Sequence, residues 1–196
     1  MTVIGIDPSM NSTGMCIKYE DDSYEYVLLS TNATNKFFKA VQEFKDIDLR
    51  MIRKETCTKG EKSIRKSIFQ QINTTENIYH IAHAAGEIIS VIHPDYVVIE
   101  APAFAAKGRV ADLMGLNHAI RLECYRRDIP CYPVPPTTVK LHSVGNGHAT
   151  KEMMIGTWLR LFPQYKSLEG MKIDDLADAY FLCSFDLESV DIEPGE

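Results

Sequence analysis

The chain has 196 residues, 45% of them hydrophobic and 24% charged, which is typical of one globular domain with a full-sized core. Its net charge of −6 argues against a protein that simply coats nucleic acid, and no apolar run approaches the ~18 residues of a membrane span. The five scattered cysteines argue against disulfide and zinc frameworks. We therefore expect an intracellular, cytoplasmic protein with one domain over residues 1–190 and an acidic tail over 191–196.

Three short strands are predicted near the N-terminus, over Thr2–Asp7, Gly14–Tyr19 and Tyr24–Thr31. The turns between them are so short that the strands must form an antiparallel meander. Residues 36–72 carry no clear periodicity, and the apolar side chains around Phe37 indicate only the start of a helix.

A helix is predicted after this segment, because Asn73 and Glu76 resemble a capping box and an apolar stripe follows them as far as His93. The β-branched run Tyr96–Glu100 predicts a central strand that is buried on both faces. Further helices are expected over 110–127, about 148–161 and about 174–187, with a short strand over Ile129–Val134. The pattern predicts an α/β fold, in which a mixed five-stranded sheet carries helices on both faces.

Four carboxylates occupy positions that a single fold can bring together. Asp7 and Glu100 each end an apolar run, and Asp178 lies one helical turn after the pair Asp174-Asp175. The helical spacing leaves open which aspartate of the pair shares a face with Asp178, and Asp174 is also placed to cap the helix. An acidic pair that only complements the helix dipole is the alternative interpretation.

Clustered carboxylates of this kind suit a site for hard divalent cations. Mg²⁺ prefers oxygen ligands, and two such ions about 4 Å apart can activate a water molecule and stabilise the leaving oxygen in phosphodiester hydrolysis. Such a site needs acidic side chains on rigid elements, which the ends of buried strands and a helix provide.

The motifs around these carboxylates resemble the RuvC family of Holliday junction resolvases, in particular its phage-encoded members. In chain order the motifs are Ile4-Gly5-Ile6-Asp7-Pro8-Ser9 with Thr13-Gly14, Val97-Val98-Ile99-Glu100, the segment from Val139-Lys140 to Lys151, and Asp175-Leu176-Ala177-Asp178-Ala179. The resemblance implies a ribonuclease-H-like fold, a homodimer, and cleavage of four-way DNA junctions by paired nicks. It also implies two Mg²⁺ ions per active site, with Mn²⁺ as a substitute, and the cytoplasm of a bacterial host if the protein is phage-encoded.

The resemblance further assigns roles to residues by their position. The catalytic metal ligands would be Asp7, Glu100, Asp175 and Asp178, which favours Asp175 over Asp174. The DNA contacts would be Phe104, inserted between bases, Lys107 and Arg109 on phosphates, and Lys140 and Lys151 near the scissile strand. A core-packed aromatic at position 104 and solvated lysines at 140 and 151 are the alternatives. The helix over 110–127 is the expected dimer interface.

Basic residues are concentrated in one part of the chain. The stretch Lys36–Lys66 holds ten of the 21 lysines and arginines against five acidic residues, whereas Ser167–Glu196 holds nine acidic residues and one lysine. The basic stretch falls in an insertion at about 36–72, where bacterial RuvC has a shorter segment. We hypothesise that the insertion widens the DNA footprint or relaxes junction selectivity, the alternative being a solvated helix of mixed charge.

Two other functions stay open from the sequence. A nuclease of the same fold that cuts forks, flaps, three-way junctions or RNA would carry the same ligands, because selectivity depends on loops and dimer geometry. An actin-like ATPase also begins with a strand, an aspartate and a Gly/Ser/Thr turn. It would need two such domains, for which this chain is too short.

Overall fold

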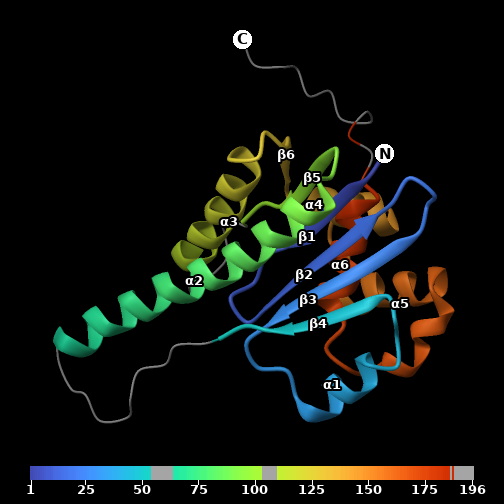
Figure 1. Cartoon of the computed structure of the whole chain (residues 1–196). Coiled ribbons are helices and arrows are strands. Elements are labelled where there is room, and N and C mark those ends of the chain that lie inside the picture. Colours follow the sequence, from blue (N-terminus) through green and yellow to red (C-terminus); the bar gives the residue numbers. More distant parts are fainter. Residues whose placement is uncertain (54–63, 103–109, 186, 188–196) are drawn as a thin grey trace.

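A six-stranded mixed sheet forms the centre of the computed structural model, which describes residues 1–53, 64–102, 110–185 and 187 (Figure 1). The strands are β1 (Val3–Asp7), β2 (Ser12–Lys18), β3 (Tyr24–Ser30), β4 (Ile47–Met51), β5 (Tyr96–Glu100) and β6 (Cys131–Val134). Their order across the sheet is β4-β3-β2-β1-β5-β6. The first three strands pair antiparallel, as predicted, whereas β4, β5 and β6 each run parallel to the neighbour on their inner side.

Helices cover both faces of this sheet (Figure 1). They are α1 (Asn35–Val41), α2 (Ile64–Ile92), α3 (Val110–Tyr125), α4 (Pro136–Val144), α5 (Lys151–Leu161), the 3-10 helix η1 (Pro163–Leu168) and α6 (Asp174–Cys183). The helices α2 and α3 pack on one face, and α1, α4, α5 and α6 pack on the other. Among the described residues no helix combines the length and apolar composition required to cross a membrane.

Side chains that alternate along the strands pack into two separate hydrophobic cores, one on each face of the sheet. In β3, Tyr26 and Leu28 face the α5 and α6 side, while Val27 and Leu29 face α2 and α3. Trp158 is fully buried in the first core and donates its indole N–H to the Tyr26 hydroxyl at 3.1 Å. Burial on both faces explains why the central strands have continuous apolar sequences.

The prediction of five strands is wrong by one, because β4 lies within the segment that showed no periodicity. Only Ile47 is buried in this strand, and Asp48 and Arg50 are exposed and paired with each other at 2.6 Å. An edge strand that buries so little has no apolar run to mark it. Part of the segment predicted as an insertion therefore belongs to the central sheet.

The predicted start of the long helix at Asn73 is also wrong. Helix α2 already begins at Ile64, so Asn73 and Glu76 lie inside it and form no capping box. Figure 1 shows the N-terminal part of α2 extending beyond the edge of the sheet. Gln70, Gln71 and Ile72 in this helix are exposed, which explains why the apolar stripe begins only in the later turns.

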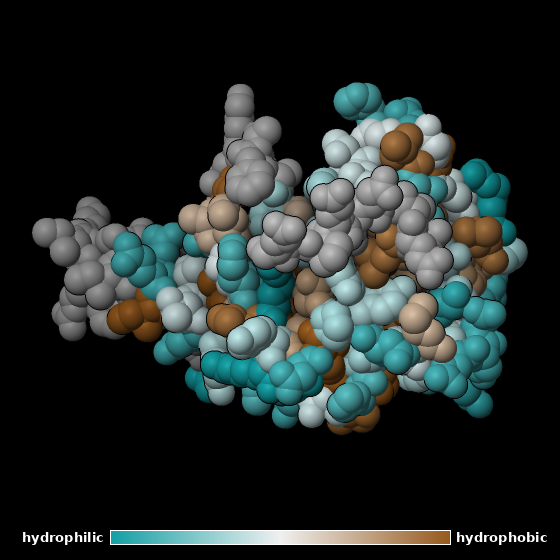
Figure 2. Space-filling view, turned by 90° about the horizontal axis from the view of Figure 1, so that it is seen from above, coloured by the Kyte–Doolittle hydropathy of each residue, from teal (hydrophilic) through white to brown (hydrophobic). Residues whose placement is uncertain are grey.

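Helix α4 is a further element that the sequence analysis did not predict. It begins with Pro136, a residue that suits the first helical position because no N–H is needed there, and ends at Gly145 with φ of 73°. Helix α5 begins at Lys151, slightly later than predicted, after Thr150 accepts a hydrogen bond from the Met153 N–H. Figure 2 shows one face of the molecule, on which hydrophobic side chains form separate small groups among hydrophilic ones.

Candidate functional site

The predicted carboxylates on strands lie at the same edge of the sheet. Strands β1 and β5 run parallel, and Ile6 pairs with Ile99, so Asp7 and Glu100 end neighbouring strands at the same level. Strand β2 begins at this edge with Ser12, which pairs with Ser30 at the end of β3. The edge therefore gathers polar residues from four strands.

Helix α6 brings the other two carboxylates to this edge because two glycines allow it to approach the sheet closely. A Cβ at Gly14 would overlap the carbonyl oxygen of Asp175 and lie 2.7 Å from its carbonyl carbon. A Cβ at Gly5 would overlap the Ala179 carbonyl oxygen and lie 2.8 Å from the Cys183 Cα. Since Gly14 pairs with Asp7, this contact places the start of α6 beside the end of β1.

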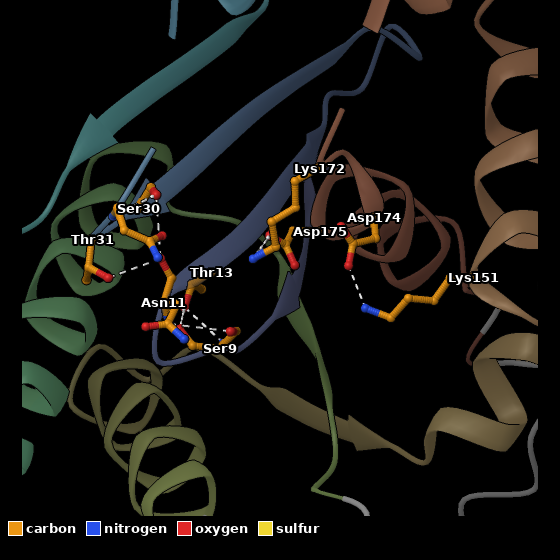
Figure 3. A network of polar contacts seen from close by, with 10 residues as sticks. Ser9, Asn11, Thr13, Ser30, Thr31, Lys151, Lys172, Asp174 and Asp175 are labelled. Atoms are coloured by element: carbon orange, nitrogen blue, oxygen red, sulfur yellow. Dashed lines mark hydrogen bonds and ion pairs between the residues drawn. The ribbon is translucent and has the colours of Figure 1, made fainter. Parts of the chain in front are cut away.

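Hydrogen bonds fix the turn that follows Asp7 (Figure 3). The Thr13 hydroxyl donates to the Ser9 carbonyl at 2.8 Å and accepts from the Ser9 N–H at 3.1 Å. The Asn11 carbonyl accepts the Thr31 N–H at 3.0 Å, which ties the turn to the end of β3. Asp7 and Ser12 are thus held at the two ends of a braced turn.

The carboxylates are close enough to change one another's ionisation. Burial, followed by the negative charges of Glu100, Asp178 and Asp175, raises the pKa of Asp7 well above its usual value. Burial and then the charge of Asp178 raise the pKa of Glu100 to about 7, although Lys140 and Lys151 act in the opposite direction. These mutual effects place carboxylates from β1, β5 and α6 in one electrostatic cluster.

The two aspartates of α6 show the same behaviour. Burial raises the pKa of Asp178 to about 6, against the opposing charge of Lys151. Burial also raises the pKa of Asp175, although a hydrogen bond from Ser12 and the charge of Lys172 lower it. The Lys172 ammonium lies 3.6 Å from Asp175 Oδ2 (Figure 3). Asp175 is only 5% exposed, which identifies it as the inward-facing aspartate of the predicted pair.

The donor set suits a hard divalent cation. All four side chains offer carboxylate oxygens, the ligands that Mg²⁺ and Mn²⁺ prefer. Among the described residues Asp175 Oδ2 is buried without a hydrogen-bond partner, and a cation would satisfy it. In their present positions, however, no three histidine, cysteine, aspartate or glutamate side chains of the described residues form a group that could hold one metal ion. We expect these carboxylates to move closer together when a cation binds.

The structure corrects the expected role of Asp174 as a helix cap. Ile173 is the N-cap residue of α6, and it makes no side-chain capping bond. Asp174 instead pairs with Lys151, with 2.5 Å between Oδ2 and Nζ (Figure 3). Burial lowers the pKa of Lys151, but the hydrogen bond with Asp174 and the charges of Asp174, Asp178 and Asp175 raise it more. Asp174 therefore holds a cationic side chain beside the carboxylate cluster.

The remaining predicted DNA contacts divide into two groups. Lys140 on α4 and Lys151 on α5 both act electrostatically on Glu100 and Asp178, so the structure brings them to the carboxylates. Phe104, Lys107 and Arg109 lie outside the described residues, as does the acidic tail 191–196.

Sequence reasoning missed three polar residues that support the site. They are Ser12, which lowers the pKa of Asp175, Lys172, which pairs with the Asp175 carboxylate, and Asn117, whose side-chain amide donates to the Glu100 carbonyl at 2.8 Å. Asn117 is 1% exposed on α3. A polar residue on an otherwise apolar helix face was the available signal for Asn117, whereas Ser12 and Lys172 carried none.

We expect the cation-free protein to lose stability as the pH rises. The folded-state pKa values of Glu100, about 7, and Asp178, about 6, exceed the ordinary values of 4.5 and 3.8. The folded state therefore binds these protons more tightly than the unfolded state, and its stability falls between about pH 4 and pH 7. Urea unfolding in EDTA should show a loss of about 3 kcal/mol for Glu100 across this window.

The Glu100→Gln variant provides the control, because it removes the titrating group and keeps the shape. It should lose less stability than the wild type between pH 5 and pH 7.5, and Mn²⁺ should stabilise the wild type more than the variant at pH 7.5. Equal pH dependence in the two proteins would contradict the clustering of the carboxylates.

Comparison with solved structures shows the same architecture. The structure of Thermus thermophilus RuvC matches over 93% of this chain and 91% of that chain, with a TM-score of 0.57 and 18% sequence identity. The chain has the RuvC fold. T. thermophilus RuvC in complex with a Holliday junction substrate matches with a TM-score of 0.56, at 19% identity, over 93% of this chain and 90% of that one.

A third structure extends the likeness beyond bacterial RuvC. The yeast mitochondrial Holliday junction resolvase matches with a TM-score of 0.50 and 14% identity, over 93% of this chain and 75% of that chain. No protein-family definition and no curated protein matches the sequence. The likeness to RuvC confirms the ribonuclease-H-like α/β class, with six strands where five were predicted.

Proposed function

We propose that this protein is a metal-dependent endonuclease that resolves four-way DNA junctions by paired nicks. The observation that carries the proposal is the cluster of Asp7, Glu100, Asp175 and Asp178 at one edge of a RuvC-like sheet. A structural neighbour with this fold is a complex with a Holliday junction substrate, which supports branched DNA as the ligand.

The four carboxylates would hold Mg²⁺ or Mn²⁺, which would supply activation of water and neutralise charge on the scissile phosphate. Glu100 and Asp178, with pKa values of about 7 and 6, would release protons as the cation binds near neutral pH. Ser12 lies close enough to Asp175 to lower the pKa of its carboxyl. Lys140 and Lys151 would attract the DNA backbone to a site that is otherwise strongly negative.

Paired nicking requires two active sites, so we propose a homodimer. Helix α3 remains the proposed interface, and its exposed Leu122 and Tyr125 are apolar residues of the kind that subunit contacts bury. Asn117 on the same helix bonds to the strand that carries Glu100.

A cleavage assay on a panel of substrates tests this function. Labelled four-way, three-way, fork, flap and RNA–DNA hybrid substrates are incubated with the protein in Mg²⁺, Mn²⁺ or EDTA. We expect two symmetrically placed nicks in the four-way junction, with ligatable ends, and no cleavage in EDTA. Equal cleavage of all branched DNA substrates, or a preference for the RNA–DNA hybrid, would show that the four-way junction is not the specific substrate. Hydrolysis of ATP without cleavage of any nucleic acid would contradict the proposed nuclease function.

A further inference from the structure

A pocket adjoins the carboxylate cluster, because Lys172 lines it and also pairs with Asp175. Its lining residues come from the ends of β2 and β3, the start of α1 and the segment before α6. They are Ser12, Ser30, Asn32, Ala33, Thr34, Lys36, Phe37, Gly170, Met171 and Lys172. Its volume is about 260 Å³, which is below the usual range for a site that encloses a whole drug-sized molecule.

Two lining residues join this pocket to the proposed active site. The Lys172 ammonium lies 3.6 Å from the Asp175 carboxylate (Figure 3), and Ser12 lies close enough to that carboxyl to lower its pKa. Ser12 also pairs with Ser30 across β2 and β3, so the pocket continues along the sheet edge that carries Asp7 and Glu100. A strand of nucleic acid that follows this edge would pass from the carboxylates into the pocket.

The chemistry of the pocket suits a sugar-phosphate backbone. None of the described residues that line it is acidic, although the chain has a net charge of −6, and two are lysines. Lys36 is exposed and has no ion-pair partner among the described residues. Ala33, Phe37 and Met171 supply an apolar wall against which a sugar can pack, while hydroxyl and amide groups surround it.

We propose that this pocket binds a backbone phosphate of the cleaved strand beside the scissile phosphate, with Lys36 as its main cationic contact. The inference rests on the proposed nuclease function and adds a second point at which the strand is held. Phosphate contacts fix the register of a strand without reading its sequence. Together with Lys140 and Lys151, which act on Glu100 and Asp178, Lys36 would give the strand a further cationic contact near the carboxylates.

The salt dependence of DNA binding tests the role of Lys36. Binding of a fluorescent four-way junction and of a single-stranded oligonucleotide is measured by anisotropy in EDTA, at several salt concentrations, for the wild type and Lys36→Gln. The slope of log K against log salt should fall by about 0.7 to 0.9 when one phosphate contact is lost. Lys39→Gln is the matched control, because Lys39 is exposed on the same helix and does not line the pocket.

Neutral methylphosphonate linkages then locate the phosphate. One linkage next to the scissile position should weaken binding of the wild type but not of Lys36→Gln. The proposed subsite would be overturned if Lys36→Gln and Lys39→Gln had equal salt slopes and no methylphosphonate linkage weakened binding of the wild type more than binding of Lys36→Gln. Binding without cleavage in Mg²⁺ would count against the nuclease function while the slopes still decide the subsite, and a wild type that binds no DNA would overturn both.

Discussion

Replacing Asp7 with asparagine is expected to lower the rate of junction cleavage on the order of 10³-fold. Mutation of a residue that merely supports a metal ligand typically lowers metal affinity or activity about 10- to 100-fold, and loss of a ligand itself should cost more. Asp7 ends the central strand and is influenced by all three other carboxylates, so it lies at the middle of the cluster. Single-turnover cleavage in Mg²⁺ gives the rate, and anisotropy in EDTA gives the affinity. The affinity should stay equal or rise, because the change removes a negative charge near the DNA.

Asp48→Asn is the control for this experiment. Asp48 is an exposed carboxylate on β4 whose partner is Arg50 at 2.6 Å, and it lies outside the cluster. This variant should cleave at the wild-type rate. Near-normal cleavage by Asp7→Asn would show that the proposed metal site is wrong.

A second large effect is expected from Gly14→Ala. The added methyl group would overlap the backbone of Asp175, which a rotation of side chains cannot relieve. Helix α6 must then move away from β2, at a cost of about 3 kcal/mol in the free energy of unfolding. Because α6 carries Asp175 and Asp178, the variant should also lose most of its cleavage activity under conditions where it remains folded.

Gly156→Ala is the matched control for Gly14→Ala. Gly156 lies within α5, and a Cβ there would meet nothing within 4 Å. Alanine has the higher helix propensity, so this variant should gain about 0.5 to 1 kcal/mol in urea or thermal unfolding. A Gly14→Ala variant with wild-type stability would contradict the close approach of α6 to the sheet.

The sequence predicted the parts of the fold that bury a regular apolar pattern. The strands around Ile6 and Ile99 and the later turns of α2 have such patterns, and the structure contains them. Strand β4 escaped prediction because it buries only Ile47, so no periodicity marks it.

For the site, sequence reasoning predicted the carboxylates but not their supporting contacts. Helical spacing left Asp174 and Asp175 equivalent, and the resemblance alone favoured Asp175. The structure distinguishes them physically, because Asp175 is buried where Gly14 packs on its backbone and Asp174 pairs with Lys151. Ser12 is a common residue type whose relation to Asp175 depends on the contact between α6 and β2, two elements far apart in sequence. Lys172 is only three residues from Asp175, but a single lysine at that spacing did not distinguish an ion pair from a solvated side chain.

The shared edge of the sheet has a consequence for how this protein can be modified. The carboxylates are anchored in strands and in α6, whereas the chain leaves β4 at Met51 and β5 at Glu100 at that same edge. Backbone hydrogen bonds from Ile52 to Ser30 and from Ala101 to Val134 hold the chain to the sheet just past these residues. We therefore expect chimaeras whose exchanged segments begin beyond Ile52 and Ala101 to keep the carboxylates in place, which makes the architecture modular.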